Sequence, residues 1–150
     1  MGTKLFVMIG VAGSGKSTVA AKLAKEYNAR IVSTDAIRKE LCGDENCADR
    51  NDEVFSLFNR RVYGGIRHGN IIADATHTHV KDWKGYFRIA PEGCEVYAVL
   101  LDVDAATAKE RQKNRERQVP EEVIDRMWNT LSQNIERLPE VFGERIMRYN

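Results

Sequence analysis

The chain lacks the features that mark membrane proteins and proteins that coat nucleic acids. Its 150 residues contain no apolar run close to the roughly 20 residues that a membrane-spanning helix needs, so we expect no such segment. The net charge is only +1, which excludes a uniformly basic surface but allows a local basic patch. Internal repeats, low-complexity tracts and linkers are also missing. These absences favour one globular domain over residues 1–150.

Cysteine is scarce as well. Cys42, Cys47 and Cys94 form no CxxC pair, and an odd number without such spacing favours reduced thiols in a cytoplasmic protein. The alternative is a metal site in which Cys42 and Cys47 join His77 and His79. Because their spacing is not that of a known zinc module, buried or incidental thiols are the preferred interpretation.

Apolar runs alternate with amphipathic stretches along the chain. Short, continuously apolar runs predict buried strands at residues 5–9, 29–32, 70–73 and 95–101, with a weaker candidate at 145–149. Helical periodicity marks residues 17–27, residues 53–67 and the segment after Pro120. The N-terminal segment reads as a first strand and not as a signal peptide. We therefore expect a three-layer α/β fold, with helices on both faces of a parallel sheet of about four or five strands.

Residues 10–17, GVAGSGKS, fit the phosphate-loop pattern GxxxxGK[ST] between a predicted strand and a predicted helix. The glycines let backbone N–H groups curl toward phosphate oxygens, and the start of the helix adds positive charge. Lys16 would reach the β- and γ-phosphates, and Ser17 would ligate Mg²⁺. The candidate nucleotide-binding residues are Gly10, Ala12, Gly13, Ser14, Gly15, Lys16, Ser17 and Thr18. The motif predicts a nucleoside triphosphate site rather than an empty glycine-rich turn.

Three aspartates follow predicted strands: Asp35, Asp74 and Asp102. The carboxyl ends of neighbouring parallel strands open on one crevice. Either Asp74 or Asp102 could hold Mg²⁺, directly or through water, although a structural role is the preferred interpretation of Asp102. Asp35 is the better general base, since Arg38 lies three residues on and could hold the acceptor. Helix capping is the alternative role for Asp35. With no NKxD segment for guanine, this pattern favours a kinase over a GTPase.

Residues 109–118, KERQKNRERQ, are rich in positive charge and lie between two helical patterns. They could be an ordinary solvated face. The functional interpretation is a lid over about residues 109–119 that closes on the triphosphate, with Arg111 and Arg115 four residues apart on one face. In phosphoryl transfer, such an arginine can be worth about 10³–10⁵ in rate.

In order along nearly the whole chain, these motifs resemble the P-loop kinase domain of polynucleotide 5′-hydroxyl kinases of the phage and bacterial end-healing type. The resemblance rests on GSGKST, on the D-x-x-R of Asp35 and Arg38, and on DAT at residues 74–76. It extends through the R-x-x-x-R of the lid to VPEEVIDRMW, which begins at Val119. The resemblance implies a P-loop kinase fold that uses ATP and Mg²⁺ to phosphorylate a 5′-hydroxyl end of RNA or DNA.

The resemblance also implies roles for single residues. Asp35 would be the general base and Arg38 would hold the 3′-phosphate of the acceptor. Lys16 and Arg115 would neutralise the transferring phosphoryl group, with Arg111 assisting on the nucleotide side.

Further implied contacts concern the acceptor and the metal. Val119 and Val123 would pack on the terminal base, which accounts for weak sequence preference. Asp74 and Thr76 would lie beside the acceptor, and Ser17 with Asp74 would hold the metal.

Two departures from the family pattern matter. Some close relatives carry a hydroxyl residue where this chain has Ala75, and many members fuse a phosphatase or a ligase that this sequence does not contain, so we expect a kinase alone. His77 and His79 could touch the acceptor strand, but polar loop residues are the preferred interpretation.

Two other functions compete with this one. One is a small-molecule kinase or antibiotic phosphotransferase on the same scaffold, and the other is a non-catalytic nucleotide-binding module. The sequence carries no signal for RNA against DNA, end geometry or breadth of nucleotide donor, and it is compatible with a homo-oligomer.

Overall fold

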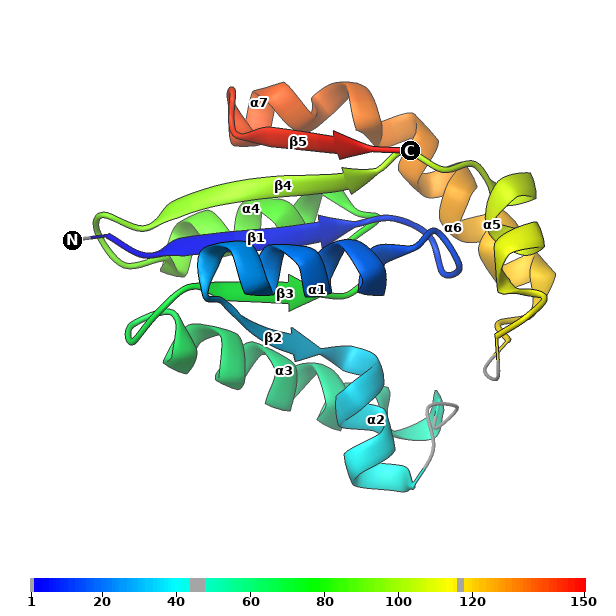
Figure 1. The fold of residues 1–150 in the computed structure, drawn as a ribbon, viewed down its shortest axis with the longest axis horizontal. Coiled ribbons are helices and arrows are strands. Elements are labelled where there is room, and N and C mark those ends of the chain that lie inside the picture. The colour runs from blue at the N-terminus through cyan, green and yellow to red at the C-terminus, as the bar shows by residue number, and fades with distance from the viewer. Residues whose placement is uncertain (1, 44–47, 116–117) are drawn as a thin grey trace.

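A five-stranded parallel sheet forms the centre of the structure, a computed structural model that describes residues 2–43, 48–115 and 118–150 (Figure 1). The strands are β1 (Lys4–Ile9), β2 (Arg30–Ser33), β3 (Ile71–Asp74), β4 (Glu95–Leu101) and β5 (Ile146–Tyr149). Their order across the sheet is β2-β3-β1-β4-β5, and every neighbouring pair is parallel. All the predicted strands are confirmed, with their ends within about one residue of the prediction.

Seven α-helices connect and cover the strands in the described part of the chain. They are α1 (Lys16–Tyr27), α2 (Thr34–Cys42), α3 (Asn51–Gly65), α4 (Val80–Ile89), α5 (Ala105–Gln112), α6 (Glu121–Asn134) and α7 (Leu138–Phe142), with 3₁₀ turns at Ala48–Arg50 and Ile135–Arg137. The predicted helices correspond to α1, α3 and α6, and the helical pattern expected before residue 109 corresponds to α5 without bounds having been given, whereas α4 was not predicted. Gly85 weakens the helical signal of α4, and α5 buries only Ala108 and Gln112.

Both faces of the three central strands, β3, β1 and β4, are buried, which explains why these strands read as continuous apolar runs. Leu5, Val7 and Ile9 of β1 point into a core shared with α3, α4, α6 and α7. Phe6 and Met8 point the opposite way and pack against α1. Figure 1 shows α1 on one face and α4 on the other. The three-layer α/β prediction is therefore confirmed.

The loop between β3 and α4 is tied to the end of β1. His77 lies in this loop, as predicted, but it is buried and has a left-handed backbone with φ of 46°. Its Nδ1 lies 2.6 Å from the carbonyl oxygen of Met8, and its Nε2 lies 2.7 Å from the hydroxyl of Tyr86. Because a carbonyl only accepts, a neutral His77 ring donates from Nδ1 and accepts from Tyr86 at Nε2. Unlike the exposed His79, it is a structural residue.

The cysteine prediction is correct for one thiol and wrong for another. Cys94 is free and half-buried. Cys42 is disulfide-bonded, contrary to the expectation of reduced thiols. The count and spacing of cysteines do not reveal this, because the fold decides which thiols meet. Cys47, the other residue of the alternative metal site, lies outside the described residues.

Among the helices of the described residues, none combines the length and the apolar character needed to cross a bilayer.

The burial of His77 predicts a pH-dependent stability. Burial lowers the pKa of the ring below its ordinary value of 6.5, although the carbonyl of Met8 and the charge of Asp82 act in the opposite direction. The unfolded chain therefore binds a proton at this ring more readily than the folded protein does. The free energy of unfolding consequently falls as the pH drops below about 6.5.

We expect the variant His77→Gln to weaken this dependence by up to about 1.4 kcal/mol per pH unit. Urea denaturation between about pH 7.5 and about pH 5.5 measures the slope. His79→Gln, which removes an exposed histidine from the same loop, is the matched control and should keep the wild-type slope. Equal slopes in the wild type and in His77→Gln would contradict the assignment.

Candidate active site

The phosphate loop occupies residues 10–15, between the end of β1 and the start of α1. Gly13 and Gly15 have left-handed φ angles of 84° and 98°. A Cβ at Gly13 would lie 2.7 Å from the carbonyl oxygen of Ala108, because α5 packs directly on the loop. Glycine is therefore required at this position by both backbone conformation and space. The loop leads into the N-terminus of α1, where free N–H groups favour an anion.

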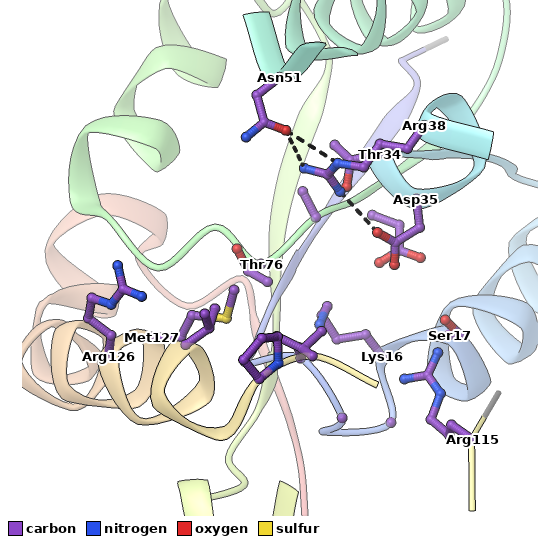
Figure 2. A pocket seen from close by; sticks show the side chains of 18 of the residues that line it. Lys16, Ser17, Thr34, Asp35, Arg38, Asn51, Thr76, Arg115, Arg126 and Met127 are labelled. Atoms are coloured by element: carbon purple, nitrogen blue, oxygen red, sulfur yellow. Dashed lines mark hydrogen bonds and ion pairs between the residues drawn. The ribbon is translucent and has the colours of Figure 1, made fainter. Parts of the chain in front are cut away.

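A cavity of about 680 Å³ opens on this loop (Figure 2). Elements that are far apart in sequence meet there, namely the loop, α2, the end of β3 and the start of α6. The predicted site residues that line the cavity are Ala12, Gly13, Gly15, Lys16, Ser17, Asp35, Arg38, Asp74, Thr76, Arg115, Val119 and Val123. The structure thus brings most of the predicted site together.

The remaining predicted residues lie beside the cavity. Gly10 donates its N–H to the carbonyl oxygen of Thr76 at 3.0 Å, which joins the loop to the end of β3. Ser14 is fully buried, and its hydroxyl has no hydrogen-bond partner in the described part of the chain. Arg111 donates from Nη1 to the carbonyl oxygen of Ser14 at 2.8 Å. Thr18 is exposed on α1.

Asp35 lies in the first turn of α2 but does not cap the helix. Ser33 is the cap, with its hydroxyl accepting from the N–H of Ala36 at 3.2 Å. The alternative interpretation of Asp35 as a capping residue is therefore wrong. Its Oδ1 accepts instead from Nη1 of Arg38 at 3.0 Å, and the two side chains face the cavity together (Figure 2).

Arg38 is also held from α3. The Oδ1 of Asn51 accepts from its Nη2 at 3.3 Å and from its Nε at 3.4 Å. The ring centroid of Phe55 lies 5.9 Å from the guanidinium carbon. Asn51 and Phe55 are four residues apart, so they share a face of α3. The sequence analysis missed both, since no local pattern reveals that this face meets α2.

Asp74, the last residue of β3, carries its carboxylate into the cavity and is 9% exposed. Burial raises the pKa of this carboxyl group, and the nearby charge of Asp35 acts in the same direction. The positive charges of Lys16 and Arg115 oppose the shift. Two carboxylates and two cations are thus close enough to influence one another. Lys16 also donates from Nζ to the carbonyl oxygen of Val11 at 3.0 Å.

The cavity is lined by a hydroxyl and a carboxylate that could hold a metal ion. Ser17 and Asp74 both line it, and their oxygens are the ligand type that Mg²⁺ prefers. Because Mg²⁺ usually takes few protein ligands and keeps several waters, this donor set fits the ion. Asp102, the other candidate, pairs instead with Arg148 at 3.8 Å outside the cavity. This placement agrees with its structural interpretation.

The predicted lid is partly helical and anchored. Residues 109–112 belong to α5, so the expectation that the whole segment lies between helices is wrong for them. Lys109 pairs with Asp125 of α6 at 2.6 Å. The amide of Gln112 holds both backbone groups of Val119, donating to the carbonyl at 2.8 Å and accepting from the N–H at 3.0 Å. Residues 116–117 of the lid lie outside the described residues.

Cavity residues that the sequence analysis did not assign to the site are Thr34, Asn51, Phe55, Ala75, Pro120, Arg126 and Met127. Pro120 and Met127 extend the apolar wall of Val119 and Val123, because positions three and four apart share a helix face. Met127 is half-buried and borders the cavity. The apolar stripe of α6 shows where this helix is buried, but it does not show that its first turns border a cavity.

Comparison with solved structures supports the fold. A chain of the Pnkp1/Rnl/Hen1 RNA repair complex is similar, with a TM-score of 0.75 and 19% identity over 90% of this chain and 46% of that chain. A gluconokinase from Sinorhizobium meliloti 1021 is similar over 98% of this chain and 81% of its own, with a TM-score of 0.65 and 21% identity. A deoxyadenosine kinase from M. mycoides has a TM-score of 0.63 and 14% identity over 97% of this chain and 90% of its own.

Sequence comparison gives a curated relative and a family. The cytidylate kinase of Ignicoccus hospitalis is 33% identical over 85 residues, 51% of this chain. This chain spans about half the length of that relative, since the match covers 48% of it. A family model described as AAA domain matches residues 5–138, from the start of β1 to the start of α7. The chain belongs to this AAA-domain family and has the fold of the P-loop kinases.

Proposed function

We propose that the chain transfers the γ-phosphoryl group of ATP to the 5′-hydroxyl end of RNA or DNA. The observation that carries the proposal is the pair formed by Asp35 and Arg38, 3.0 Å apart in the cavity that Lys16 also lines. A carboxylate beside a guanidinium suits an acceptor that brings both a hydroxyl and a phosphate. The similarity to a chain of an RNA repair complex is consistent with such an acceptor.

The proposed step moves one proton and one phosphoryl group. The oxygen of the 5′-hydroxyl forms a bond to the γ-phosphorus, and Asp35 accepts the proton that this hydroxyl loses. The bond between that phosphorus and the oxygen bridging to the β-phosphate breaks, and ADP leaves. Lys16 and Arg115 donate to phosphoryl oxygens and offset their charge. When Mg²⁺ is bound at Ser17 and Asp74, directly or through water, it supplies further positive charge to the phosphates.

The rest of the cavity suits a nucleotide end. Arg38 would hold the 3′-phosphate of the terminal nucleotide through charge-assisted hydrogen bonds. The apolar wall of Val119 and Val123 would pack on the terminal base, whatever its identity, because every base has a flat face. Thr76 would lie beside the acceptor, and Arg111, which holds the phosphate loop through Ser14, would act from the nucleotide side.

A second candidate is a nucleoside monophosphate kinase, favoured by the identity with a cytidylate kinase. Its acceptor is a phosphate oxygen, which is already deprotonated at neutral pH and needs no general base. Asp35 would then have no proton to accept. The position of this carboxylate in the cavity therefore favours a hydroxyl acceptor.

The decisive experiment incubates the protein with Mg²⁺ and γ-labelled ATP. Separate reactions receive a 5′-hydroxyl oligonucleotide, cytidine monophosphate or gluconate, and the label on each acceptor is measured. We expect transfer to the oligonucleotide. The variant Lys16→Ala should abolish it, because it removes a cation that contacts the transferring phosphoryl group. Transfer only to a small acceptor would support a metabolite kinase, and transfer to none would support a nucleotide-binding module.

Asp35→Asn should lower the rate of phosphoryl transfer by about 10²–10⁴, because the amide cannot accept the proton. The KM for ATP should change little, since Asp35 acts on the acceptor. Single-turnover kinetics measure the chemical step. Asp102→Asn, a change of the same kind at a strand end outside the cavity, is the control. Normal turnover in Asp35→Asn would contradict the base assignment and make Asp74 the next candidate.

Arg38→Ala should lower kcat/KM by about 10- to 100-fold for acceptors with a 3′-phosphate, as expected for lost hydrogen bonds to a charged group. The loss should be smaller for plain nucleosides. Arg61→Ala, which removes an exposed ion pair with Glu40, controls for loss of an arginine. Losses of the same size on both acceptor types would count against phosphate binding by Arg38.

A further inference from the structure

Phe55 of α3 is an exposed aromatic ring inside the proposed acceptor site. Its exposed fraction is 43%, although α3 buries Val54, Phe58 and Val62 almost completely. Exposed apolar residues are common on proteins, so exposure alone carries no argument. Phe55 lines the cavity, whereas Phe87, which is also 43% exposed, does not.

The ring is fixed in place by two neighbours. Phe58 meets it edge to face, with centroids 6.3 Å apart and an interplanar angle of 69°. The guanidinium carbon of Arg38 lies 5.9 Å from its centroid. Such packing holds an aromatic ring in one orientation, which lowers the entropy lost when a ligand stacks on it.

Arg38 lies between Phe55 and the proposed general base. Nη1 contacts Asp35, whereas Nε and Nη2 contact Asn51, one helical turn before Phe55. Nη1 and Nη2 of Arg38 each carry a second N–H, which could donate to an oxygen of the acceptor. In Figure 2, Asp35 lies on one side of the guanidinium and Asn51 of α3 on the other. A phosphate bound by Arg38 would therefore have the carboxylate on one side and α3 on the other.

The covalent structure of a nucleic acid would connect the side of Asp35 with the side of α3. The phosphate 3′ to the terminal nucleoside joins it to the second nucleoside. With the 5′-hydroxyl at Asp35 and this phosphate at Arg38, the strand continues past the guanidinium toward α3. We propose above that the terminal base packs on Val119 and on Val123 of α6, so Phe55, the exposed ring of α3 that lines the cavity, is left for the strand beyond the phosphate.

We propose that Phe55 is a stacking platform for the base of the second nucleotide of the acceptor strand. This inference rests on the proposed function and narrows the substrate class to strands of two or more nucleotides. Base stacking on an aromatic ring tolerates every base, so the platform adds affinity without sequence preference. It distinguishes a nucleic acid end from a single nucleotide that carries the same 3′-phosphate.

The test compares acceptors that differ only beyond the first phosphate: a nucleoside 3′-phosphate, a dinucleotide, and a dinucleotide whose second residue is abasic. In the wild type, kcat/KM should be about 5- to 150-fold higher for the dinucleotide than for its abasic form. In Phe55→Ala this ratio should fall toward one, whereas Phe55→Trp should retain it. Phe87→Ala, which removes an equally exposed ring outside the cavity, should keep the wild-type ratio.

Fluorescence provides a measurement that needs no turnover. A dinucleotide with 2-aminopurine as its second base should lose fluorescence when it binds the wild type, because stacking quenches this base. Phe55→Leu keeps an apolar side chain but no aromatic face, so it should bind with little quenching. It also replaces Phe55→Ala if that variant does not fold.

Three results would overturn the inference. One is a wild type that treats the dinucleotide and its abasic form alike, and another is an equal loss on all acceptors in Phe55→Ala. The third is undiminished quenching in Phe55→Leu. If the wild type phosphorylates none of these acceptors, the proposed function fails and the platform fails with it, whereas phosphorylation without base discrimination removes only the platform.

Discussion

The parallel pairing of β1, β3 and β2 is the constraint on which the site depends. Ser33 of β2 is in register with Asp74 of β3, and Val7 of β1 with Ala73. Parallel strands end on the same edge of a sheet, so the segments that follow them open on one crevice. The phosphate loop, the first turn of α2 and the loop after β3 therefore meet there, although they are far apart in the sequence.

Contacts outside the strands join the segments at this edge. Gly10 bonds to the carbonyl of Thr76, and the buried His77 bonds to that of Met8. On the opposite side, Gln112 of α5 holds the backbone of Val119 through both of its amide atoms. Each contact joins segments that are not paired with each other in the sheet. A rigid frame matters for phosphoryl transfer, which relies mainly on positioning and on charges that are already in place.

The charged side chains in the cavity are placed as the proposed reaction requires. Lys16 and Arg115 act on the buried carboxylate of Asp74, whereas Asp35 is more exposed and pairs with Arg38. Of the two carboxylates, the buried one lies near Lys16 and Arg115, and the more exposed one lies beside Arg38. A base that must meet an incoming hydroxyl has to be reachable, and a metal-binding carboxylate gains from a low dielectric.

The sequence by itself determined the strands, the phosphate loop and the adjacency of Asp35 and Arg38, because these follow from local periodicity and from spacing within one turn. It did not determine α4 or the bounds of α5, whose helical signals are weak, or the disulfide of Cys42. Only the tertiary structure decided that Asn51 and Phe55 contact Arg38, and that Met127 borders a cavity. Helix periodicity shows which residues share a face, but the partner of that face is chosen by packing between distant segments.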